Sequence, residues 1–209
     1  MAVQQKVLTP RVVVQMLLFV VVVPFLPLLI SGHWNWWEAW VYAAVCIFGF
    51  IISRFLAGRR NPGLLEERGH FLENPNPESW DKILSPLLGL GGGVIPLVVG
   101  LDARFGSSAD FSLAIKLLAF LIFLLGYALG SYALMANRYF SGMVRLQTER
   151  GHSVVKSGPY RWIRHPGYAG ALLSYLATPF LLDSWWALLP VALTFLVIII
   201  RTRLEDRFL

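Results

Sequence analysis

A series of long apolar runs limits the possible folds of this chain more than any other feature. A membrane helix needs about 20 apolar residues to cross about 30 Å of hydrocarbon, and each run reaches or approaches that length. The composition agrees, because 56% of the residues are hydrophobic and only 14% are charged. We therefore expect an all-α integral membrane protein in one domain, 1–209, with about six transmembrane helices at 12–30, 36–56, 83–101, 111–135, 168–182 and 185–200.

Prolines and glycines interrupt two of these runs. Pro24 and Pro27 are expected to kink the first, whereas Pro86 and Pro96 and four nearby glycines are expected to make the third irregular. Neighbouring membrane helices can satisfy the freed backbone groups. The glycines at 89 and 91–93 favour close helix packing, with a phosphate cradle as the alternative. No Gly-x-Gly-x-x-Gly follows a predicted strand, so a Rossmann domain is not expected.

The basic residues determine the expected orientation. In a six-span arrangement only Arg104 and Lys116 fall on one side, and the other arginines and lysines fall opposite. The positive-inside rule then places both termini and the longer loops in the cytoplasm. This pattern explains the net charge of +6 better than a nucleic-acid partner does. A single cysteine and four scattered histidines predict neither an internal disulfide nor a metal site.

The last two apolar runs predict a helical hairpin that turns at Asp183 and Ser184. Arg164 and Glu205 stand almost equally far from Ser184 along the chain. Two antiparallel helices with the same rise per residue would return Glu205 to the level of Arg164. This juxtaposition predicts either an interfacial salt bridge or a functional site, and the two interpretations are compatible.

The stretch 158–168, with the sequence GPYRWIRHPGY, combines chemically versatile side chains between two apolar regions. Pro166 suits the first turn of a helix, which leaves the first amides of that helix free. Free amides at the positive end of a helix dipole, preceded by Arg164 and His165, predict a site for a carboxylate or phosphate. The alternative is an interfacial anchor, because Tyr, Trp and Arg also gather at membrane boundaries.

The same stretch resembles the signature of the isoprenylcysteine carboxyl methyltransferase family of integral membrane enzymes. These enzymes carry a Gly-Pro-Tyr-Arg-x-x-Arg-His-Pro-x-Tyr run. The resemblance extends upstream through Gln147 and 151–157 and downstream to 204–209, where Glu205 and Asp206 match an acidic pair. It divides the chain into a helical scaffold, 1–135, and a methyltransferase-like cofactor-binding region, 136–209.

The resemblance implies S-adenosylmethionine as cofactor and methyl transfer to a lipophilic acceptor that carries a carboxylate, amine or thiol and enters from the bilayer. Tyrosine rings would stabilise the cofactor's sulfonium, and Glu205 would hold its amino or ribose end. Arg164 and Glu205 are the implied catalytic residues, with Arg164 a candidate for orienting an acidic acceptor. The implied cofactor-binding residues are Gln147, His152, Val154, Val155, Gly158, Tyr160, His165, Tyr168 and Glu205.

Two other functions remain open at this stage. Distantly similar Arg-His-x-x-Tyr motifs occur in NADPH-dependent membrane sterol-type reductases, and a non-enzymatic membrane scaffold would also fit the hydropathy. The loop 57–81 is expected to be a solvated connector or short interfacial helix, with a lid over the site as the alternative. The expected partners are membrane lipids and a lipophilic or lipid-modified substrate, and the sequence leaves the oligomeric state open.

Overall fold

The computed structural model describes residues 10–64, 78–145 and 147–208, and no strand occurs among them. The predicted all-α class is therefore confirmed for the described part of the chain. Its long helices are α1 (Pro10–Ser31), α2 (Trp37–Arg60), α4 (Asp81–Arg104), α5 (Leu113–Ala136), α6 (Pro166–Leu181) and α7 (Leu188–Phe208). Two short 3-10 helices, η1 (Thr148–Arg150) and η2 (Gly158–Arg161), precede α6.

Every predicted span is a helix with ends shifted by a few residues, except that α7 continues to Phe208, about two turns beyond the predicted end at 200. The irregularity expected of the third span is wrong, because α4 runs continuously through Pro86 and Pro96. Three of the described helices, α2, α4 and α5, are long and apolar enough to cross a membrane. The number of crossings and the cytoplasmic placement of the termini stay predictions. The central part of the 57–81 loop, including His70, lies outside the described residues.

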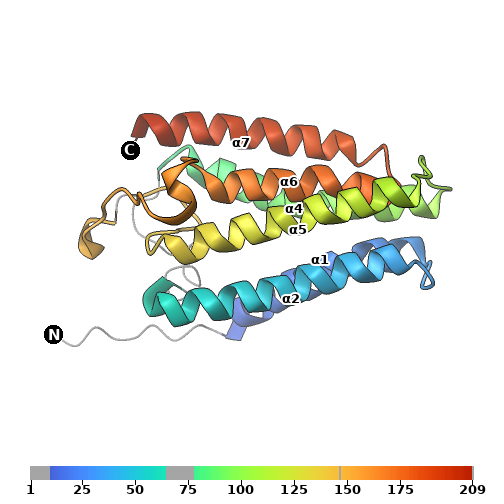
Figure 1. Ribbon diagram of the computed structural model, residues 1–209, viewed down its shortest axis with the longest axis horizontal. Helices are drawn as coiled ribbons and strands as arrows, with labels where there is room; N and C mark the ends of the chain where they lie inside the picture. The colour runs from blue at the N-terminus through green and yellow to red at the C-terminus, as the bar shows by residue number, and fades with distance from the viewer. Residues whose placement is uncertain (1–9, 65–77, 146, 209) are drawn as a thin grey trace.

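The helices form an elongated antiparallel bundle (Figure 1). One end, which we call the site end, gathers η1, η2, the first turns of α1, α4 and α6, and the last turns of α2, α5 and α7. The turns 32–36, 105–112 and 182–187 close the opposite end. The predicted hairpin thus turns where expected and returns the end of α7 to the beginning of α6.

Glycines set the closest helix contacts. A Cβ atom on Gly126 of α5 would lie 2.6 Å from the carbonyl oxygen of Gly170 on α6, so the two backbones touch. On α4, a Cβ on Gly92 would meet the Tyr175 hydroxyl of α6 at 3.1 Å, and Gly91 faces Thr194 of α7. The packing interpretation is therefore confirmed for Gly91 and Gly92. It is wrong for Gly89 and Gly93, where an added Cβ would meet nothing within 4 Å. Although α6 and α7 are consecutive, α6 packs mainly on α5 and α7 mainly on α4.

Polar side chains hold the opposite end together. Lys116 Nζ of α5 lies 2.7 Å from Glu38 Oε1 of α2 and 2.5 Å from Asp183 Oδ2 in the turn after α6. Asp102 of α4 accepts a 2.6 Å hydrogen bond from Ser184 in the same turn. We call Glu38, Lys116 and Asp183 the far-end ion cluster. It fixes the α6–α7 turn against α2 and α5.

Candidate active site

The site begins at the first turn of α6. Pro166 is its first residue and His165 is its N-cap, so the predicted helix start is confirmed. Ala169 N donates a 3.0 Å hydrogen bond to the His165 carbonyl, which closes the first turn. Residues three apart share a helix face, and the rings of His165 and Tyr168 accordingly stack with centroids 5.6 Å apart and an angle of 23°.

The end of α7 brings two carboxylates to these rings. The Tyr168 hydroxyl donates a 2.9 Å hydrogen bond to Glu205 Oε2, and His165 Nε2 lies 2.9 Å from Asp206 Oδ1. We call His165, Tyr168, Glu205 and Asp206 the hairpin mouth. Its assembly from residues far apart in sequence confirms that the hairpin returns Glu205 to the 158–168 stretch, where it meets Tyr168 and His165.

Arg164 reaches the mouth only at its rim. Its nearest described acidic partner is Asp206, at 4.0 Å from Nη1, and its side chain is 84% exposed. An exposed pair at this distance contributes little to stability. Arg164 is thus free to reorient toward an anionic ligand, and its catalytic role stays a prediction.

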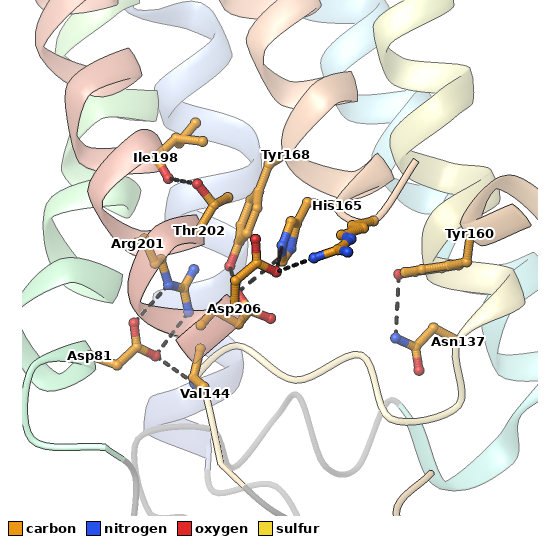
Figure 2. A network of polar contacts seen from close by, with 12 residues as sticks. Asp81, Asn137, Val144, Tyr160, His165, Tyr168, Ile198, Arg201, Thr202 and Asp206 are labelled. Carbon is orange, nitrogen blue, oxygen red and sulfur yellow. Dashed lines mark hydrogen bonds and ion pairs between the residues drawn. The ribbon is translucent and has the colours of Figure 1, made fainter. Parts of the chain in front are cut away.

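The structure adds two residues that the sequence analysis did not assign to the site. Arg201 lies one helical turn before Glu205, and its guanidinium carbon is 5.4 Å from the centre of the Tyr168 ring. Asp81, at the first position of α4, receives hydrogen bonds of 2.7 and 2.9 Å from Arg201 (Figure 2). In the sequence alone, Arg201 counts only toward the membrane orientation and Asp81 ends a predicted loop. The four-residue spacing between Arg201 and Glu205 could have indicated a shared helix face.

Tyr160 approaches from η2. Its hydroxyl accepts a 3.3 Å hydrogen bond from Asn137 Nδ2 at the end of α5. Burial raises the pKa of Tyr160 to about 12, so its ring is neutral at physiological pH. Figure 2 shows Tyr160 and Asn137 on one side of His165 and Arg201 with Asp81 on the other. Gly158, with φ of +58°, begins this turn where a Cβ would lie 2.9 Å from Ala136 Cβ.

The upstream residues named by the resemblance belong to the loop between α5 and η2. The Gln147 side chain is buried, donates a 2.8 Å hydrogen bond to the Tyr139 carbonyl and accepts a 2.7 Å bond from Arg150. The His152 ring packs 4.8 Å from that of Tyr139, and Val154 is 74% exposed. Val155 is half-buried. The cofactor-binding roles of these residues stay predictions.

The charged and aromatic groups of the site suit a ligand that carries both a positive and a negative charge. Glu205 offers a carboxylate that is only 19% exposed, beside the aromatic face of Tyr168. Arg164 and the first-turn amides of α6 offer positive charge a short distance away. S-adenosylmethionine combines a sulfonium, an amino group and a carboxylate, so the residues present fit its chemistry.

Two comparisons with known proteins bear on the part of the chain that contains this site. Residues 117–209 match the model of the isoprenylcysteine carboxyl methyltransferase family. A Saccharomyces cerevisiae protein named protein-S-isoprenylcysteine O-methyltransferase is 33% identical over 110 residues, which make up 48% of this chain and 44% of the yeast protein. The chain thus spans less than half the length of this relative. The family match over residues 117–209 covers the whole candidate site except Asp81.

Proposed function

Because residues 117–209 match the model of the isoprenylcysteine carboxyl methyltransferase family, we propose that the chain is a member of this family and an integral membrane methyltransferase that uses S-adenosylmethionine to methylate a lipophilic acceptor. The hydrogen bond between Tyr168 and Glu205 carries the proposal. It joins the Arg-His-Pro motif to the acidic pair, so that aromatic and anionic groups for one cationic ligand lie together.

Residues of the hairpin mouth and their neighbours would bind different parts of the cofactor. When bound, S-adenosylmethionine supplies the electrophilic methyl group. Glu205 would hold the cofactor's ammonium or ribose hydroxyls, and the faces of Tyr160 and Tyr168 would stabilise positive charge. Arg164, His165 and the first amides of α6 would hold a carboxylate. Arg164, being exposed, is the better placed of these to orient an acidic acceptor.

Methyl transfer to a nucleophile depends chiefly on alignment and on charges that are already in place. The mouth supplies both, because its side chains are held by contacts within the protein. We propose that the acceptor carries a carboxylate, amine or thiol at the end of an apolar chain or lipid group. The yeast relative is named for an isoprenylcysteine acceptor, and a lipid-modified cysteine is one member of this class.

We infer that all six predicted spans cross the membrane and that the site end faces the cytoplasm. Three helices with the length and apolarity of membrane spans support this placement. The described site end also carries an excess of arginine near the helix ends, as the positive-inside rule requires. These arginines include Arg59, Arg60, Arg138, Arg161, Arg164, Arg203 and Arg207. Such a mouth would receive the cofactor from the cytosol and the acceptor from the bilayer.

Binding of labelled S-adenosylmethionine to the full chain in lipid nanodiscs tests the proposal. We expect saturable binding that S-adenosylhomocysteine displaces, and a melting temperature that rises with S-adenosylmethionine but not with NADPH. The absence of binding both in detergent and in lipid would contradict the proposed function. Stabilisation by NADPH alone would indicate reductase chemistry.

A further inference from the structure

We propose that Asp81 is a positioning residue for the hairpin mouth: through Arg201 it fixes the orientation of Tyr168 and keeps Glu205 available to the cofactor. This inference rests on the proposed function, because it assigns a residue outside the family match to the same site. Asp81 belongs to α4, in the half of the chain that the sequence analysis treated as scaffold. Its side chain is fully buried, with 0% exposed.

Both carboxylate oxygens of Asp81 accept hydrogen bonds. Its Oδ1 accepts a hydrogen bond of 2.7 Å from Arg201 Nε, and its Oδ2 accepts one of 2.9 Å from Arg201 Nη2. Oδ2 also accepts a 2.6 Å hydrogen bond from the backbone amide of Val144. One carboxylate therefore joins α4, α7 and the loop that leads to η1 (Figure 2).

The ion pair between Asp81 and Arg201 has one well-defined geometry. Arg201 is 5% exposed, and Nη2 also donates to Ser85 Oγ at 2.9 Å and to the Gly142 carbonyl at 3.0 Å. A buried ion pair offsets the cost of desolvation only when its geometry is good and its remaining protons are bonded. The fork of two parallel bonds also resists rotation of the guanidinium.

Arg201 in turn contacts the hairpin mouth. Its guanidinium lies over the Tyr168 ring at 5.4 Å, within the range of a cation–π attraction. The same ring stacks on His165, and its hydroxyl donates to Glu205. Fixing Arg201 therefore fixes the plane of Tyr168 and with it the direction of the hydroxyl.

Loss of the Asp81 charge should act on Glu205 as well. Arg201 would become a buried cation without its carboxylate, which is costly. Glu205 lies one turn along the same helix, at a spacing that allows an ion pair with Arg201. Pairing between the two would neutralise the carboxylate that we assign to the cofactor. The consequence is weaker cofactor binding rather than lower stability alone.

The far-end ion cluster supplies a matched control. Glu38 is 6% exposed and pairs with Lys116 at 2.7 Å, but it lies at the opposite end of the bundle. Asp81→Asn and Glu38→Gln each replace a buried, paired carboxylate by its amide. Both should lower the melting temperature. Only Asp81→Asn should weaken S-adenosylmethionine binding per folded molecule, by about fivefold or more, the lower end of measured coupling between sites.

A double-mutant cycle separates positioning from general loosening. We expect the combined effect of Asp81→Asn and Glu205→Gln on cofactor affinity to be smaller than the product of the single effects, because both act on the same carboxylate. Fully multiplicative effects, or unchanged affinity in Asp81→Asn, would overturn the inference. If Asp81→Asn does not fold, Ser85→Ala carries the test. It removes the hydroxyl that accepts a hydrogen bond from the Arg201 guanidinium and should weaken binding about twofold or more. Unchanged affinity would refute the proposal.

The same measurements distinguish the two proposals. Wild-type protein that binds no S-adenosylmethionine contradicts the proposed function and this inference together. Wild-type binding that Glu205→Gln weakens and Asp81→Asn leaves intact contradicts only the positioning role.

Discussion

Replacing Glu205 with glutamine is the most direct test of the hairpin mouth, because it removes a charge while keeping the shape. The glutamine carbonyl can still accept the Tyr168 hydroxyl, which now donates at 2.9 Å. His165 Nδ1 is 4.0 Å from Glu205 Oε2, so the substitution breaks no short bond to the imidazole. The cost to folding should therefore be that of a weakened hydrogen bond, well under the cost of leaving a buried group unpaired.

The cost to cofactor binding should be larger. A hydrogen bond to a charged group contributes about 1.5–3 kcal/mol. At 1.4 kcal/mol per factor of ten, this loss raises the dissociation constant of S-adenosylmethionine by about 10-fold to 150-fold. The Glu205 side chain is only 19% exposed, so solvent does not screen the interaction fully.

The assay measures two quantities on one preparation in lipid nanodiscs: the dissociation constant by titration with S-adenosylmethionine and the melting temperature without ligand. Glu38→Gln is the control, because it neutralises a paired carboxylate in the far-end ion cluster and leaves the hairpin mouth unchanged. A Glu205→Gln protein with a lower melting temperature and unchanged affinity would refute the reasoning. Glu205 would then hold the hairpin together and take no part in the site.

Three further predictions concern neighbouring parts of the structure. Tyr168→Phe keeps the ring between Arg201 and His165 but loses the hydroxyl, and titration should show S-adenosylmethionine binding weakened by about 0.5–1.5 kcal/mol; an effect as large as that of Glu205→Gln would assign the hydroxyl a direct contact with the ligand. Gly126→Ala places a methyl group 2.6 Å from the Gly170 carbonyl oxygen and should destabilise the fold by about 1–3 kcal/mol in thermal unfolding. Gly130→Ala on the same helix is the control: its methyl group meets nothing within 4 Å, so the change should be neutral or stabilising. The difference in tyrosinate absorbance between wild type and Tyr160→Phe should show a phenol that ionises near pH 12. Because the raised pKa favours the neutral phenol in the folded state, the stability it contributes is present below about pH 10 and is lost as the pH rises toward 12. Ionisation near pH 10 would contradict the burial of this ring.

Much of the architecture could be read from the sequence because hydrocarbon leaves few alternatives to a helix. The runs at 36–56 and 111–135 became α2 and α5 with small changes at their ends. The return of Glu205 to the 158–168 stretch was likewise accessible, since Arg164 and Glu205 lie almost equally far from Ser184 along the chain. The partner was not, because Glu205 accepts its hydrogen bond from Tyr168, in the first turn of α6, rather than from Arg164. Periodicity could not show that α6 would prefer α5 over α7. That choice depends on the small surfaces of Gly126 and Gly170, which become neighbours only in three dimensions.

The pair formed by Asp81 and Arg201 was not predictable in the same way. The two residues are far apart in sequence, belong to no shared motif, and lie at helix positions where solvated charges are common. One general argument could have raised the possibility: an arginine and a carboxylate beside membrane spans avoid lipid and tend to pair with each other. Only the structure shows that the pair is buried and that it touches Tyr168.

The backbone contact between Gly126 and Gly170 also sets a depth. Tyr168 precedes Gly170 by two residues, or about 3 Å along the helix axis, and α6 cannot slide on α5 without driving carbonyl groups into each other. In the proposed membrane placement, the hairpin mouth therefore stays at one height relative to the bilayer surface. If the acceptor is anchored by an apolar tail, the distance from its tail to its nucleophile must match that height. The bundle would then select acceptors by length, before any side chain of the mouth distinguishes their head groups.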